Sequence, residues 1–181
     1  MKTWFKWIAI AATVAAAAVV APAAAQAAPY CGITWGSLDK AAGALSQDPL
    51  FNVRAGRHTC FDRLVMDFDG SPAGYTVRYV SSVHAQGTGN VIPLRGGAFL
   101  EITLLAPAYD ANGNATYSPA TPSELVNVSG WNTFRQASFG GSYEGYTTIG
   151  LGVRARLPFR VFTLAGPGEG SRLVIDVAHR W

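Results

Sequence analysis

From Phe61 to the end of the chain, short runs of residues alternate between apolar and polar side chains. The clearest runs place their apolar residues at Leu64/Met66/Phe68, Tyr75/Val77/Tyr79, Leu100/Ile102/Leu104, Ile149/Leu151/Val153 and Leu173/Ile175/Val177. A period of two puts alternate side chains on opposite faces of a β-strand. Turns rich in Gly, Pro, Asn or Asp separate the runs, at residues 69–72, 87–90, 112–113 and 166–168. Short strands with one apolar face each predict an all-β fold, a sandwich of two sheets.

Other segments carry weaker signals. The run 159–164 is apolar on both faces, which favours a central strand over an edge strand. Residues 126–128 and 134–139 are expected to add two further strands. The one short helix is predicted over residues 37–45, where Ser37 would cap its start and Pro49 would limit its extension.

One sequence pattern occurs twice. Arg63-Leu64-Val65-Met66-Asp67-Phe68 returns as Arg172-Leu173-Val174-Ile175-Asp176-Val177. Each copy places an Arg before, and an Asp within, an apolar strand. Two interpretations stay open: strands that merely look alike, or a sandwich with pseudo-symmetric halves.

The N-terminal segment has the layout of a secretory signal peptide. Lys2 and Lys6 precede an uncharged, Ala-rich run over residues 8–21, and Ala25-Gln26-Ala27 forms an A-x-A cleavage site. A membrane span would need about 20 residues of stronger hydrophobicity. We therefore expect residues 1–27 to be a cleaved signal peptide and residues 28–181 to form a single domain without a membrane span.

The expected mature chain has two cysteines, Cys31 and Cys60. A lipoprotein is disfavoured because Ala28-Pro29-Tyr30, which precedes Cys31, does not resemble a lipobox. An even pair in an exported protein predicts a disulfide. Two cysteines alone cannot form a structural zinc site, so no metal is expected.

Removing the signal peptide also removes most of the net positive charge, which is +3 for the whole sequence. Lys and Arg together fall from 14 to 12 against 11 Asp and Glu, which leaves a net charge of +1. A nearly neutral domain has no general attraction for nucleic acid. Of the 12 remaining cations only Lys40 is a lysine, and arginine is the better partner for carboxylates and phosphates.

The chain resembles the AMIN-like domain proteins exported by actinobacteria, which are related to the AMIN domain of peptidoglycan amidases and secretins. The segments that carry the resemblance are residues 31–37, 52–58, 60–65, 94–97, 147–153, 158–164 and 172–177. It implies a β-sandwich and a non-catalytic module that localises proteins to the cell wall. No amidase or secretin domain accompanies it here, and the family supplies no ligand residues that can be carried over.

Catalytic motifs are weak in this sequence. Ser37-Leu38-Asp39-Lys40 matches S-x-x-K, but the S-D-N and K-T-G elements that accompany this motif in penicillin-recognising enzymes are missing. A Ser-His-Asp arrangement would have to use His179 with Asp176, or His58 with Asp62, and no G-x-S-x-G elbow supports either. We expect no enzyme and no cofactor, with a hydrolase as the remote alternative.

The segment 110–114, Asp-Ala-Asn-Gly-Asn, is rich in oxygen ligands. An EF-hand would require Gly and Glu where the chain has Ala115 and Thr121. A hairpin or extended loop is therefore favoured, and a weak calcium site at Asp110 is the alternative.

The candidate ligand-binding residues are Arg54, Arg57, Arg95 and Trp131. The three arginines are expected in Gly-containing loops, where they would bind carboxylates or phosphates. Internal salt bridges to Asp62, Asp67 or Asp176 are the alternative. Trp131 follows a Ser-Gly turn and would stack on sugar rings, with a core position as its alternative; Trp35 and Trp181 are further aromatic candidates.

These features predict a secreted, wall-associated module that binds a cell-wall polymer, most plainly peptidoglycan. The alternative is a structural domain that binds another envelope protein, for example by edge-strand addition.

Overall fold

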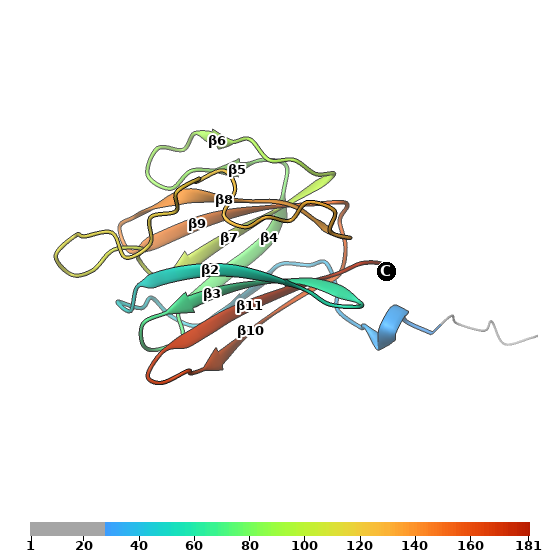
Figure 1. Cartoon of the computed structure of the whole chain (residues 1–181), viewed down its shortest axis with the longest axis horizontal. Helices are drawn as coiled ribbons and strands as arrows, with labels where there is room; N and C mark the ends of the chain where they lie inside the picture. The colour runs from blue at the N-terminus through green and yellow to red at the C-terminus, as the bar shows by residue number, and fades with distance from the viewer. Residues whose placement is uncertain (1–27) are drawn as a thin grey trace, which may run out of the picture.

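Antiparallel strands account for nearly all the regular structure of the described residues (Figure 1). The computed structural model describes residues 28–181, and the predicted signal peptide lies outside this range. A 3-10 turn, η1 (Tyr30–Gly32), precedes eleven strands: β1 (Lys40–Ala42), β2 (Leu50–Arg57), β3 (Phe61–Phe68), β4 (Gly74–Val80), β5 (Val83–His84), β6 (Val91–Ile92), β7 (Ala98–Leu105), β8 (Phe134–Tyr143), β9 (Tyr146–Val153), β10 (Phe159–Ala165) and β11 (Ser171–Ala178).

Two sheets form the sandwich. The first has five strands in the order β1-β4-β7-β9-β8, the second has four in the order β10-β11-β3-β2, and β5 and β6 form a separate pair. The predicted inward side chains of β3, β4, β7, β9 and β11 meet between the sheets in one buried cluster. The all-β, two-sheet prediction is confirmed. Within residues 28–181, no helix is long and apolar enough to cross a bilayer.

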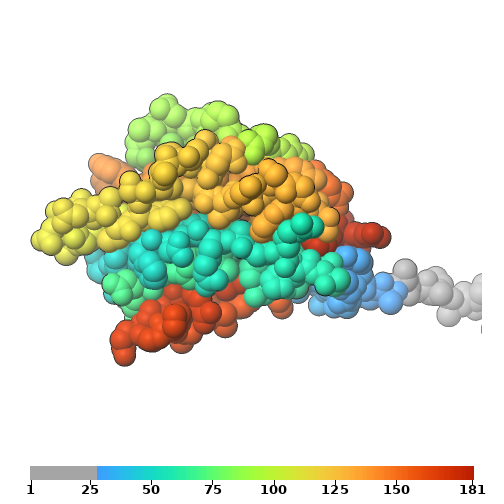
Figure 2. Space-filling view, viewed as in Figure 1, coloured from blue at the N-terminus to red at the C-terminus, as the bar shows by residue number. Residues whose placement is uncertain are grey.

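A long loop, residues 106–133, closes the side of the sandwich between β8 and β2 (Figure 2). Leu50 N–H on β2 donates to Pro107 O at 2.8 Å, and Thr116 Oγ1 donates to Leu50 O at 2.7 Å. The strand predicted at residues 126–128 is wrong, because these residues belong to this loop. Val128 is apolar because its side chain enters the core from the loop, not because it lies on a strand.

The helix predicted over residues 37–45 is also wrong. Lys40–Ala42 forms β1, which pairs with β4 at the edge of the five-stranded sheet. Ser37 does not act as a cap, since its hydroxyl accepts a hydrogen bond from Arg156 Nε at 3.2 Å. Gly43 follows with φ +78°, a conformation that ends the strand and that L side chains rarely adopt.

The prediction that residues 159–164 form a central strand is wrong as well. This segment is β10, which lies at the edge of the four-stranded sheet with only β11 as a neighbour. Phe159 points into the core, while Phe162 packs against arginine side chains on the outer face. The second apolar face is therefore covered by arginines and not by another layer.

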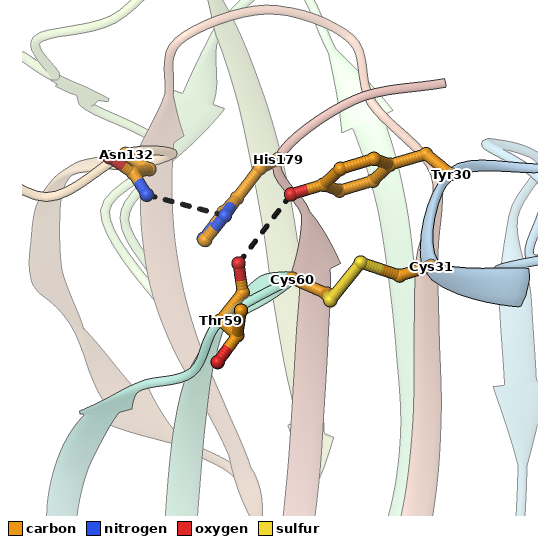
Figure 3. Close-up of a disulfide and its surroundings, with 6 residues drawn as sticks. All are labelled: Tyr30, Cys31, Thr59, Cys60, Asn132 and His179. Carbon is orange, nitrogen blue, oxygen red and sulfur yellow. Dashed lines mark hydrogen bonds between the residues drawn. A yellow bond between two sulfur atoms is a disulfide. The ribbon is translucent and has the colours of Figure 1, made fainter.

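The predicted disulfide is confirmed. Cys31 and Cys60 are bonded, with their Cα atoms 6.2 Å apart, and the bond joins the segment around η1 to the β2–β3 turn (Figure 3). It holds Tyr30 beside this turn, where the tyrosine hydroxyl donates to Thr59 O at 3.5 Å.

Candidate functional site

The repeated sequence pattern forms the centre of the four-stranded sheet. Strands β3 and β11 are antiparallel neighbours, and their register places Arg63 opposite Asp176, Val65 opposite Val174, and Asp67 opposite Arg172. Because the strands run in opposite directions, the Arg of each copy faces the Asp of the other. The pattern is therefore self-complementary across one strand pair.

The ion pairs on this sheet are less symmetric than the sequence. Asp176 accepts two bonds from Arg63, at 2.6 and 2.8 Å, and a third from Arg160 Nε at 2.8 Å. Asp67 is bound instead by Arg54, at 2.9 and 3.0 Å, and by Asn52 at 2.9 Å. Both carboxylates thus have several charged or amide donors, and these hydrogen bonds raise the pKa of Arg54 and of Arg63.

All these side chains lie on the outer face of the sheet. Val65 and Val174 are buried, yet they do not belong to the core cluster between the sheets. They form an apolar middle row, with the Arg160–Asp176–Arg63 row on one side. Arginine stems cover apolar surface well while their charged ends stay in water, which explains how two valines are buried on an outer face.

Aromatic rings alternate with the guanidinium groups at one end of this face. Arg160 Cζ lies 4.5 Å from the Trp35 ring centroid and 5.0 Å from that of Phe162. Arg63 Cζ lies 5.3 Å from the ring centroid of Phe61. These distances are within the range of cation–π contacts. We call this surface the arginine–aromatic face; it comprises Trp35, Arg54, Phe61, Arg63, Arg160 and Phe162.

The charge that this face presents to solvent is positive. The side chains of Arg54, Arg63 and Arg160 are 50%, 24% and 42% exposed, whereas those of Asp67 and Asp176 are 9% and 0% exposed. The buried carboxylates therefore orient the guanidinium groups from the side that faces the protein, and the guanidinium groups face solvent. The surface can stack on a sugar ring and donate hydrogen bonds to an anionic group.

Of the four predicted ligand residues, two lie on β2. Arg54 belongs to the arginine–aromatic face, and the expected alternative of a salt bridge to Asp67 is also present. Arg57 ends the strand, is exposed, and forms no ion pair or side-chain hydrogen bond within residues 28–181. The expectation that these two arginines lie in loops is wrong, because β2 extends through both.

The other two predicted residues lie near β8 and have internal roles. Arg95 lies in the connection between β6 and β7, where its guanidinium binds both carboxylate oxygens of Glu124 and donates to Arg135 O at 3.1 Å. The Trp131 ring stacks on Phe134 with centroids 6.0 Å apart and packs against the core. The structure therefore does not join all four residues in one site.

The histidine that sequence motifs paired with Asp176 binds a different carboxylate. His179 Nε2 donates to Asp62 Oδ1 at 3.1 Å, and Nδ1 accepts from Asn132 Nδ2 at 3.3 Å. An Asp–His pair activates a nucleophile through its second ring nitrogen. Here that nitrogen faces the Asn132 amide, and no hydroxyl or thiol among residues 28–181 is hydrogen-bonded to the His179 ring. His58 is exposed and stacks on Phe61, with centroids 4.5 Å apart.

The oxygen-rich segment 110–114 is a turn stabilised by its own carboxylate. Asp110 Oδ1 accepts the backbone N–H groups of Asn112 and Asn114, and Oδ2 accepts the Asn114 amide at 3.0 Å. The Asn114 side chain, followed by the backbone donors, lowers the pKa of Asp110. Among the described residues, no three His, Cys, Asp or Glu side chains are grouped as metal ligands.

Sequence reasoning missed Arg63, Arg160, Phe61 and Phe162 as surface candidates. The sequence nevertheless contains two features that are consistent with a surface made of these residues. The repeated Arg and Asp positions indicated paired strands, and the apolar outer positions of 159–164 indicated an aromatic surface. Neither feature identifies the surface by itself, because only the strand register shows that β10, β11 and β3 lie side by side.

Comparisons with known proteins agree with this description. The AMIN-like domain matches residues 48–179, well over half of the chain. No curated protein and no solved structure matches the chain. AMIN-like domains are envelope-type modules and are in general non-catalytic, and the disulfide agrees with a position outside the cytoplasm. The chain belongs to the AMIN-like domain family.

Proposed function

We propose that this protein is a secreted, non-catalytic envelope module that binds peptidoglycan through the arginine–aromatic face. The observation that carries the proposal is the pairing of exposed guanidinium groups with half-buried rings on one outer face. Peptidoglycan offers the two complementary chemistries, sugar rings for stacking and peptide carboxylates for arginine. The family supports a role in the envelope.

The arrangement of charges favours binding over catalysis. Each carboxylate on this face is occupied by arginine or amide donors, so neither is free to act as an acid or base. The arginines are held in fixed orientations by these same bonds. A preorganised donor loses less entropy on binding a ligand, which suits a module that must recognise a polymer without changing it.

Arg57 lies at the end of β2 on the same side of the strand as Val53 and Ala55, which pack in the core, and therefore on the opposite side from Arg54. Its guanidinium is exposed and free of protein acceptors within the described part of the chain. Arg57 is therefore not part of the proposed surface, and Arg54 is the polymer contact on β2. Arg95 and Trp131 are left out of the proposed surface because their contacts bind the 106–133 loop and the core.

The test is co-sedimentation of the purified protein with isolated peptidoglycan at low and moderate salt. The double variant Arg54→Ala, Arg160→Ala removes two exposed cations from the face and is expected to weaken binding by about tenfold. Higher salt should weaken the remaining interaction, since exposed charges are screened.

The chain supplies a closely matched control. Arg78 pairs with Glu101 on the outer face of the five-stranded sheet, with side-chain exposures of 52% and 11% that nearly equal those of Arg54 and Asp67. Arg78→Ala should leave binding within about twofold of the original. Equal losses in both variants, or no sedimentation of the unaltered protein, would reject the proposal and favour an envelope protein as the partner.

A further inference from the structure

A polar cleft lies at the end of the sandwich where β9 and β11 finish and β8 begins. Its volume is about 360 Å³, and it is lined by Tyr30, Thr59, Asn132, Arg154, His179 and Arg180. Figure 3 shows Tyr30, Asn132 and His179 converging from different segments next to the disulfide. None of these residues belongs to the arginine–aromatic face.

The charge of the cleft is positive. Neither Arg154 nor Arg180 has a carboxylate within ion-pair distance among residues 28–181. The nearby buried carboxylate, Asp62, already accepts the backbone N–H groups of Thr133 and Phe134 and the ring N–H of His179. Asp62 therefore has three protein donors, and neither guanidinium group of the cleft forms an ion pair with it.

The guanidinium groups also retain free donors. Arg180 Cζ lies 5.3 Å from the Tyr30 ring centroid, and its side chain forms no hydrogen bond to the described residues. Arg154 donates one bond, to the His179 carbonyl oxygen. A guanidinium carries five N–H donors, so most of those at the cleft have no protein acceptor.

One wall of the cleft depends on the disulfide. Tyr30 precedes Cys31 and lies outside residues 48–179, the part that matches the family. The bond to Cys60 fixes this segment against the β2–β3 turn. The disulfide thereby places an aromatic ring against Arg180 and narrows the cleft from one side.

We propose that this cleft binds an oxyanion, the carboxylate or phosphate group of a ligand, between Arg154 and Arg180. Arg–oxyanion hydrogen bonds are charge-assisted and stronger than neutral ones. The Asn132 amide has a second N–H that His179 does not use, and it supplies a further donor at the same site. The proposal does not rest on peptidoglycan binding by the outer face, since the two surfaces share no residue.

The experiment is an NMR titration of backbone amides in the purified, oxidised protein with three probes: inorganic phosphate, N-acetylalanine and N-acetylalanine amide. The first two carry an oxyanion, and the third is the uncharged match of the second. Shifts are expected at residues lining the cleft with phosphate, N-acetylalanine or both, and not with the amide. Tighter binding of phosphate would indicate a ligand with a phosphate group, and tighter binding of N-acetylalanine a ligand with a carboxylate.

Arg154→Gln and Arg180→Gln should each weaken binding by about tenfold, whereas Arg78→Gln on the opposite sheet should not. Arg180 is exposed and without side-chain hydrogen bonds in the described structure, so Arg180→Gln keeps the test valid even if Arg154→Gln unfolds. No saturable shifts up to about 50 mM of either anion, equal binding of the amide, or an unchanged affinity in Arg180→Gln would overturn the proposal.

Discussion

Arg63→Met tests the energetic basis of the arginine–aromatic face. The side chain of Asp176 is fully buried and accepts three hydrogen bonds, two of them from Arg63. Methionine keeps most of the apolar stem that covers the outer face while removing the guanidinium. The substitution thus leaves a buried carboxylate with Arg160 as its remaining charged donor.

The expected loss in the free energy of unfolding follows from the burial of Asp176. Removing one partner of a buried ion pair destabilises a protein by about 3–5 kcal/mol. Because Arg160 still binds Asp176, we expect a loss at the lower end of this range, about 3 kcal/mol. For a domain of this size, that corresponds to a loss of about 6–12 °C in Tm. The same substitution at Arg54, whose side chain is half exposed, should cost about 1 kcal/mol or less.

The assay is urea unfolding followed by tryptophan fluorescence, with Arg54→Met and Arg78→Met measured beside Arg63→Met. We expect the free energy of unfolding to fall clearly more for Arg63→Met than for either of the other two. A cost below about 1 kcal/mol for Arg63→Met would show that the ion pair with Asp176 does not fix Arg63 in place, and the argument for preorganised arginines would fail.

Three further outcomes are expected. Replacing Cys31 and Cys60 by Ser should reduce the free energy of unfolding by ~3.6 kcal/mol, the chain-entropy value for a sequence separation of 29, and urea unfolding measures it. Burial raises the pKa of Tyr117 to about 12, so its neutral form is favoured by folding; this stabilisation is complete below about pH 10 and is lost as the pH rises towards 12. The difference in absorbance at 295 nm between the original protein and Tyr117→Phe should therefore titrate near pH 12. Gly152→Ala would place its Cβ against the backbone carbonyl of Arg95, and thermal unfolding should show a cost of about 3 kcal/mol.

Each of these has a contradicting result. A disulfide-free variant as stable as the original would mean that the unfolded chain is not restricted by the bond. A difference titration centred near pH 10 would show that Tyr117 is solvated. A Gly152→Ala variant of unchanged stability would mean that β9 and the Arg95 segment separate at little cost.

Local alternation was sufficient to predict the strands with one apolar and one polar face. β3, β4, β7, β9 and β11 all place their predicted apolar residues in the core, because a period of two is a property of the strand itself. Local alternation does not reveal β1, because this strand is stabilised by its pairing with β4. A helical cap can be recognised locally, whereas an edge strand of three residues depends on a partner distant in sequence.

The candidate site is harder to predict from the sequence for the same reason. Arg63 and Asp176 were visible as parts of a repeated pattern, but only the antiparallel register places them opposite each other. Turn residues flank Arg95 and Trp131 in the sequence, but their partners are Glu124, in the loop before β8, and Phe134, on β8. Side-chain partners across strands cannot be derived from spacing along one strand.

The most direct test of peptidoglycan binding by the arginine–aromatic face is an NMR titration of the protein with soluble peptidoglycan fragments. The account predicts that amide shifts concentrate on β10, β11 and β3, around Phe162, Val174 and Val65, and that the Trp35 indole shifts with them. Shifts confined to the five-stranded sheet around Arg78 and Glu101, or no shifts at saturating fragment, would contradict it.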